Sequence, residues 1–260
     1  MSAATAVAPP ARWLLLLESG APLEYAASLA AAPWLLKAPR GDGHAVIVYP
    51  GFLASDFSTR PLRRLLRTLG HDVHGWGQGR NLGARAATVD QALAQLRAMH
   101  AASGRRVSLV GWSLGGLYAR EVAKRAPDSV RAVVSLGSPF TGPRDANRAT
   151  RTYRRLQRGQ TAAPIRHEDL HEPPPCPTTS IFSRTDGIVA WPCSLQAPGA
   201  LAESIEVRAS HLGLGVNPFA LYALADRLAQ AEGAWRPFDR GGAPRWAYPD
   251  PYRSIEETET

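Results

Sequence analysis

The sequence has few cysteines and no long run of apolar residues. Cys176 and Cys193 are its only cysteines, too few for a disulfide-stabilised scaffold and at no zinc-like spacing. They flank a predicted strand and the loop after it, so a disulfide in an oxidising compartment and two reduced thiols in the cytoplasm both stay open. Two apolar segments, residues 13–17 and 26–36, are well below the roughly 20 residues that a membrane span needs. The sequence therefore predicts no transmembrane segment.

The N-terminal apolar segments also lack the features of an export signal. Residues 13–17 are too short for the core of a signal peptide, follow Pro9 and Pro10, and end at Glu18. A cytoplasmic location is therefore expected. Residues 26–36 favour a helix packed on the domain.

Lysine is almost absent, although the chain is basic. Lys37 and Lys124 are the only lysines of a chain with a net charge of +8 and a pI near 10.1. The arginines that carry the charge are spread along the chain, whereas a nucleic-acid surface gathers basic residues on one face. The densest stretch, residues 144–158, contains one aromatic side chain, Tyr153. We therefore expect no nucleic-acid partner.

What the sequence does contain is a regular alternation of buried-strand and helix patterns. A chain of 260 residues with 45% hydrophobic content can bury one sizeable core. The pattern predicts a single α/β domain whose mainly parallel sheet has helices on both faces. An N-terminal helical extension (about 1–43), a lid insertion (about 140–177) and an irregular tail (about 234–260) are expected as additions. The expected strands are residues 44–49, 72–76, 106–110, 130–136, 178–183 and 204–208, and the expected helices are 58–69, 88–102, 117–125 and 218–230.

A nucleophile pattern lies between one predicted strand and the next helix. The segment Gly111-Trp-Ser-Leu-Gly115 matches the G-x-S-x-G turn, which exposes its serine hydroxyl at the N-terminus of a helix. The positive end of the helix dipole favours negative charge at that point. Ser113 is thus the expected nucleophile.

Chain order selects a base and an acid for this serine. In folds with this turn, the acid and then the histidine follow the nucleophile, each after a later strand. Of seven histidines, only His211 follows a strand late in the chain. Asp186 follows another strand, in Ile181-Phe-Ser-Arg-Thr-Asp-Gly187, and is expected to orient the imidazole. Asp145 and Asp169 have no preceding strand and are weaker candidates.

Two backbone N–H groups are expected to form an oxyanion hole. One belongs to Leu114, the residue after the nucleophile. The other is assigned to Phe52, in the turn Pro50-Gly-Phe-Leu53 that follows the first strong strand. Donors of this kind stabilise the charge that develops on a substrate carbonyl oxygen.

Together these motifs resemble those of the α/β-hydrolase superfamily, and within it the bacterial lipase/esterase-like serine hydrolases. The resemblance covers about residues 44–230. It implies a short version of the family sheet that lacks the first antiparallel strands, for which residues 13–17 are a candidate strand. A Pro-Gly-Phe sequence replaces the His-Gly often found at the oxyanion turn, which leaves the backbone donor intact. The motifs are Tyr49-Pro-Gly-Phe52, Gly111-Trp-Ser-Leu-Gly115, Ser183-Arg-Thr-Asp-Gly187 and Ser210-His211.

The expected activity is hydrolysis of carboxylic esters of short to medium acyl length, in a pocket lined by aromatic side chains. The insertion is long enough for a lid of one or two short helices. An acyltransferase using the same triad, an amidase, and a non-catalytic binding protein on the same fold remain alternatives. The expected pocket residues are Phe57, Trp112, Phe140 and Trp191, with Phe52 beside them.

One further pattern has the spacing of a metal site but lacks the structure around it that such a site needs. The segment His167-Glu-Asp-Leu-His171 fits the H-E-x-x-H spacing of zinc proteases. Such a site needs a stable helix and a third ligand, whereas Pro164 and Pro173 bracket the segment. No metal or cofactor is expected.

Overall fold

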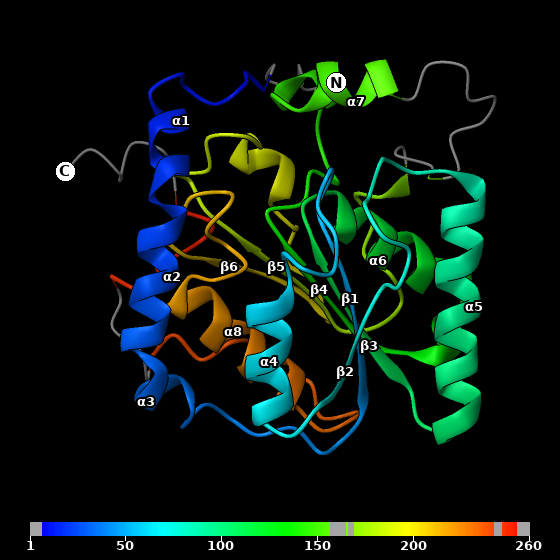
Figure 1. The fold of residues 1–260 in the computed structure, drawn as a ribbon. Coiled ribbons are helices and arrows are strands. Elements are labelled where there is room, and N and C mark those ends of the chain that lie inside the picture. The colour runs from blue at the N-terminus through cyan, green and yellow to red at the C-terminus, as the bar shows by residue number, and fades with distance from the viewer. Residues whose placement is uncertain (1–6, 157–164, 166–168, 242–245, 254–260) are drawn as a thin grey trace.

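The computed structural model describes residues 7–156, 165, 169–241 and 246–253, and its centre is a six-stranded sheet (Figure 1). The strand order is β2-β1-β3-β4-β5-β6, and all neighbours pair in parallel. The predicted α/β class is confirmed. The strands are β1 (Ala45–Tyr49), β2 (Asp72–Gly75), β3 (Val107–Trp112), β4 (Val130–Leu136), β5 (Thr178–Phe182) and β6 (Ala202–Glu206).

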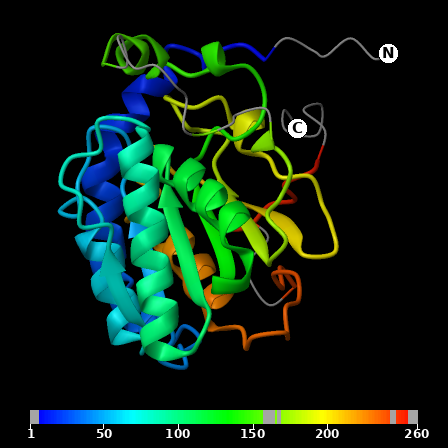
Figure 2. The same ribbon diagram turned by 90° about the vertical axis from the view of Figure 1, so that its right-hand side faces the viewer.

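Helices cover both faces of the sheet, and the central strands are accordingly buried and mainly apolar. On one face Leu66 and Leu224 lie in a cluster with Val48, and on the other Leu96 and Leu117 lie in a cluster with neighbouring strand residues. Figure 2 shows the second face, with two helices lying along it. The first face carries α4 (Arg60–Thr68) and α8 (Pro218–Ala229), and the second carries α5 (Ala86–Ser103) and α6 (Leu114–Arg125).

The strand register brings three turns to one edge of the sheet. Tyr49 at the end of β1 pairs with Gly111 of β3, and Trp112 pairs with Leu136 at the end of β4. In parallel sheets ligands bind at the carboxyl ends of the strands. The turns that follow β1, β3 and β4 are therefore neighbours at this edge.

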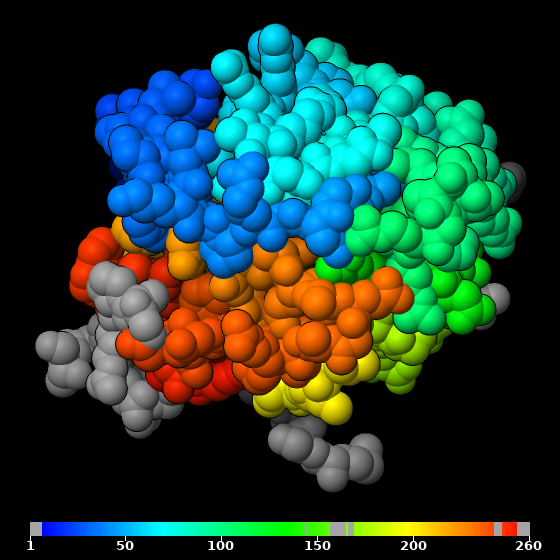
Figure 3. Space-filling view, turned by 90° about the horizontal axis from the view of Figure 1, so that it is seen from below, coloured from blue at the N-terminus to red at the C-terminus, as the bar shows by residue number. Residues whose placement is uncertain are grey.

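The N-terminal extension is helical and packs beside α4 and α8. It consists of α1 (Leu14–Leu17), a 3-10 turn η1 (Glu18–Gly20), α2 (Ala21–Ala30) and α3 (Ala32–Leu35). The suggestion of a strand at residues 13–17 is thus wrong, because this segment docks against loops and not against a sheet edge. Trp34 stacks on Tyr222 of α8 with ring centroids 4.7 Å apart. In Figure 3 the extension, in blue, borders both helices.

The remaining additions contain little regular structure. After β4 come two short 3-10 and α turns, η3 (Arg144–Ala146) and α7 (Thr150–Leu156), and α7 lies beyond the carboxyl edge of the sheet (Figure 1). Parts of the predicted lid and tail, residues 157–164, 166–168, 242–245 and 254–260, lie outside the described residues. In the described tail, Tyr248 packs edge-on against Phe238 at 4.8 Å. Short 3-10 turns also occur at η2 (Pro127–Ser129) and η5 (Trp191–Ser194).

Among the helices of the described segments, none combines the length and the apolar character needed to cross a membrane.

Candidate active site

Ser113 lies in a strained turn between β3 and α6. Its backbone has φ 54° and ψ −120°, a conformation that a residue with a side chain rarely adopts and that costs about 1–3 kcal/mol. The flanking glycines make the turn possible. A Cβ at Gly111 would lie 2.2 Å from the carbonyl oxygen of Gly115, and a Cβ at Gly115 would lie 2.2 Å from that of Tyr49. The sequence pattern G-x-S-x-G thus reflects close backbone packing.

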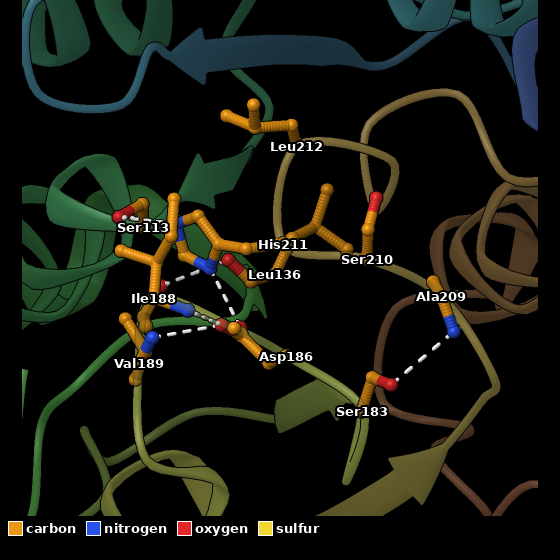
Figure 4. Close-up of polar contacts among 12 residues, drawn as sticks. Ser113, Leu136, Ser183, Asp186, Ile188, Val189, Ala209, Ser210, His211 and Leu212 are labelled. Carbon is orange, nitrogen blue, oxygen red and sulfur yellow. Dashed lines mark hydrogen bonds and ion pairs between the residues drawn. The ribbon is translucent and has the colours of Figure 1, made fainter. Parts of the chain in front are cut away.

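His211 lies between Ser113 and Asp186 (Figure 4). Its Nε2 is 3.0 Å from the Ser113 hydroxyl oxygen, and its Nδ1 is 2.6 Å from Oδ2 of Asp186. Both His211 and Asp186 are buried, at 4% and 3% exposure. The carboxylate can only accept, which assigns the proton to Nδ1 and leaves Nε2 as an acceptor facing the serine.

Asp186 is itself held by backbone donors. Its Oδ1 accepts hydrogen bonds from the N–H groups of Ile188 and Val189, at 2.8 and 2.7 Å. Burial lowers the pKa of His211, but the charge and hydrogen bond of Asp186, together with the charge of Glu18, outweigh this and raise it above its usual value. The surroundings therefore favour a positive charge on the imidazole.

The turn after β1 brings Phe52 next to the serine. A Cβ at Gly51 would lie 3.4 Å from the Cβ of Ser113. Leu114 is the first residue of α6, so its N–H has no partner within the helix. Both residues expected to form the oxyanion hole line the cavity that also contains Ser113.

Asn81 holds this turn in place. The side chain is fully buried, donates to the carbonyl oxygen of Pro50 at 2.8 Å and accepts from the N–H of Gly83 at 3.1 Å. Its backbone also bonds to Leu53 and Ala54. Asn81 belongs to the glycine-rich segment 75–83, whose composition gave no sign of this role.

Ser113 opens onto a cavity of about 440 Å³ that is mainly apolar. Phe140, Phe52 and Leu114 line it, as do Thr150, Tyr153 and Arg154 of α7, which contribute polar groups as well. The part of the insertion that the structure describes therefore forms one wall of the cavity.

Three of the four expected pocket residues lie elsewhere, and only Phe140 lines the cavity. Phe57 is 78% exposed in a turn before α4. Trp112 packs against the apolar cluster under α4 and α8 and donates its indole N–H to the carbonyl oxygen of His211 at 3.1 Å. Trp191 stacks on Phe182 and on the Arg184 guanidinium. Sequence position placed them near the site but could not give the direction of each side chain.

A second serine–histidine–aspartate chain lies at the opposite edge of the sheet. His44 Nε2 is 2.8 Å from the Ser108 hydroxyl oxygen, and its Nδ1 is 2.7 Å from Oδ1 of Asp42. Ser108 is 1% exposed and adjoins a cavity of only about 20 Å³. Asp42 also pairs with Arg105 and Arg131. Of these two chains, the one that ends at Ser113 adjoins the larger cavity, and the Ser108 chain is part of a buried network with arginine partners.

In the described residues, neither the cysteine thiols nor the metal-like pattern forms a group of metal ligands. Cys176 and Cys193 are buried free thiols in separate apolar clusters, and burial raises the pKa of each to about 11. Within the described segments no three histidine, cysteine or acidic side chains are grouped as metal ligands. His167 lies outside the described residues.

A family model described as alpha/beta hydrolase fold matches residues 27–169, more than half of the chain. The chain belongs to the alpha/beta hydrolase fold family. The predicted resemblance to this superfamily is thus confirmed. No curated protein sequence matches it.

Solved structures agree on the fold at low sequence identity. Aspergillus fumigatus lipase B is similar with a TM-score of 0.57 and 17% identity, over 83% of this chain and 56% of that chain. This chain thus spans little more than half the length of that lipase. A monoacylglycerol lipase of Paleococcus ferrophilus is similar with a TM-score of 0.50 and 17% identity, over 74% and 97% of the two chains.

Proposed function

We propose that this hydrolase-fold protein cleaves carboxylic esters through an acyl-enzyme on Ser113. The observation that carries the proposal is the continuous hydrogen-bonded chain Asp186–His211–Ser113, which ends in a hydroxyl on the wall of a cavity. An acceptor nitrogen 3.0 Å from the hydroxyl is within the reach that proton removal requires. The similar lipases share the fold, and the geometry of the three side chains supports the chemistry.

In the first step the Ser113 hydroxyl oxygen attacks the ester carbonyl carbon while its proton passes to Nε2 of His211. The carbonyl oxygen becomes an oxyanion that accepts hydrogen bonds from the N–H groups of Phe52 and Leu114. Collapse of this intermediate breaks the ester bond, and the departing alkoxide takes the proton from Nε2. Asp186 stabilises the transient imidazolium without accepting its proton.

In the second step water hydrolyses the acyl-enzyme by the same route. His211 takes a proton from the water, and the hydroxide attacks the acyl carbon. The proton then returns to the Ser113 oxygen, which leaves as the hydroxyl. The carboxylic acid departs and the enzyme is restored. The two steps therefore need no metal or cofactor as a reactant.

The cavity supports acyl groups of short to medium length as substrates. Phe52, Leu117 and Phe140 give it an apolar wall, and Thr150 and Arg154 of α7 bring polar groups to its other side. An acyl chain against the apolar wall would place its carbonyl at Ser113. In this arrangement α7 acts as a lid element that keeps water from the bound chain.

The test is hydrolysis of p-nitrophenyl esters of increasing acyl length under reducing conditions. We expect activity in the wild type with an optimum at short to medium chains, and a loss of roughly 1,000-fold or more in Ser113→Ala. Ser108→Ala is the matched control, because it removes the serine of the other chain and leaves the cavity intact. Equal activity in wild type and Ser113→Ala would refute the proposal.

A further inference from the structure

A buried carboxylate of the N-terminal extension joins the loop that carries Asp186 to the loop that carries His211. Oε1 of Glu18 accepts hydrogen bonds from the backbone N–H groups of Gly187 and His211, both at 2.9 Å, and Oε2 accepts one from Leu212 at 2.8 Å. Bonds from backbone donors to an ionised carboxylate are about twice as strong as neutral ones. One side chain, far away in sequence, thus fixes the spacing of the two loops.

The glycine after Asp186 makes this contact possible. A Cβ at Gly187 would lie 2.5 Å from the carbonyl oxygen of Leu14 and 3.0 Å from Oε1 of Glu18. Any larger residue would push the extension away from the loops. The sequence Asp186-Gly187 therefore serves both the acid of the triad and the docking of the extension.

Glu18 accepts three backbone hydrogen bonds, but no cationic side chain in the described residues pairs with its charge. It is 8% exposed, and no lysine or arginine forms an ion pair with it in the described part of the chain. A buried charge of this kind is costly unless it is satisfied. Asp186 is the main cause of the raised pKa of His211, and the charge of Glu18 adds to it, so Glu18 also complements the cation that forms on His211 during hydrolysis.

We propose that Glu18 is a positioning residue for His211. It holds the histidine backbone against the Asp186 loop and favours the imidazolium over the neutral ring, and this role rests on the ester hydrolysis proposed above. An interaction that is stronger in the transition state than in the resting enzyme raises kcat and leaves KM little changed. Glu18 is not among the described residues that line the cavity, so its loss should affect kcat more than KM.

Besides the Trp112 indole, which donates to the His211 carbonyl oxygen, ionisable and hydroxyl groups contact the His211 ring or its loop. Asp186 meets Nδ1, Ser113 meets Nε2, and Glu24 of α2 accepts from the backbone N–H and the hydroxyl of Ser210 at 2.9 and 2.6 Å. Glu24 also accepts from Asn217 at 2.8 Å, but it bonds to neither His211 nor Gly187. It is the matched control, since it anchors the same loop without touching the histidine.

The experiment follows two pH profiles for wild type, Glu18→Gln, Glu18→Asp and Glu24→Gln. One is the profile of kcat and KM with the best p-nitrophenyl ester, and the other is the rate of labelling of Ser113 by a fluorophosphonate. The acidic limbs of kcat/KM and of the labelling rate report protonation of His211 in the free enzyme, and the limb of kcat reports it in the substrate complex. Thermal unfolding of each variant accompanies them, so that a loss of folding is visible.

For Glu18→Gln we expect kcat to fall about 10-fold or more with KM within about 2-fold of wild type. The acidic limb should move down by about 0.5–1 pH unit, less than the ~1–3 units produced by a directly adjacent opposite charge. Glu18→Asp keeps the charge and should restore the position of the limb. Glu24→Gln should lower the melting temperature without moving the limb.

Two results would overturn the inference. If Ser113 is labelled in the wild type and folded Glu18→Gln shows the wild-type limb and kcat, Glu18 does not position His211. If Glu24→Gln moves the limb as far as Glu18→Gln does, general loosening of the loop is the cause. A wild type that leaves Ser113 unlabelled would instead contradict the proposed hydrolysis, and the role of Glu18 with it.

Discussion

At the scale of single residues, the candidate site depends on polar side chains whose partners are distant in sequence. Chain order and the strand patterns were enough to select Ser113, Asp186 and His211, because each follows a strand and parallel strands end at one edge. They could not select Glu18 or Asn81. The partners of Glu18 lie about 170 residues or more away, and nothing local marks an acid at the end of a leucine run as buried.

Replacing Asn81 should weaken both the fold and the turn that carries Phe52. Asn81→Ala removes the bonds to Pro50 and Gly83 and leaves a buried carbonyl and N–H without a partner. We expect a loss of about 2–3 kcal/mol in the free energy of unfolding. Because the Phe52 turn loses its support, kcat should fall roughly 10–100-fold, below the cost of ~100–1,000-fold for complete loss of an oxyanion donor.

Urea unfolding and ester kinetics of Asn81→Ala measure the two effects. A stable variant with unchanged kcat would show that the turn holds its position without Asn81.

At the scale of elements, the apolar runs predicted every strand of the sheet to within about three residues. This worked because a parallel sheet covered on both faces needs mainly apolar strands, such as 130–136, in which five of the seven residues are apolar. The pocket was harder to predict. Aromatic residues in loops have no periodicity, so the outward turn of Phe57 and the stacking of Trp191 depend on tertiary contacts alone.

The contact between the N-terminal extension and the Asp186 loop should not tolerate a side chain at Gly187. Gly187→Ala forces a Cβ against the carbonyl oxygen of Leu14 and should lower the free energy of unfolding by about 1–3 kcal/mol. It should also lower kcat, because the Asp186 loop shifts with the extension. Gly20→Ala is the control, since a Cβ there meets nothing within 4 Å.

Differential scanning calorimetry and ester kinetics compare the two variants. Equal melting temperatures for Gly187→Ala and wild type would mean that the extension does not press on this loop.

At the scale of the whole molecule, two buried histidines tie the stability of the fold to pH. His44 and His71 pack edge to face with ring centroids 5.1 Å apart. In the described part of the chain neither ring nitrogen of His71 has a hydrogen-bond partner. Burial, followed by the charge of His44, lowers the pKa of His71 to about 4, and burial lowers that of His44 as well.

A pKa lowered on folding means that the unfolded chain binds more protons, so stability rises with pH in this window. The free energy of unfolding should therefore fall as the pH drops from about 6.5 to about 4, by on the order of 2 kcal/mol for His71. His71→Leu should flatten this dependence. Urea unfolding at several pH values measures it, and an unchanged slope in the variant would refute the assignment to His71.

The most direct test of the central claim is to find which serine reacts. The described part of the protein contains two serine–histidine–aspartate chains, and the proposed chemistry belongs to the one that meets the 440 Å³ cavity. Peptide mass spectrometry after fluorophosphonate treatment of the wild type should find one adduct, on Ser113 within the segment Gly111–Gly115. An adduct on Ser108, or a folded protein in which Ser113 stays unmodified, would contradict the account.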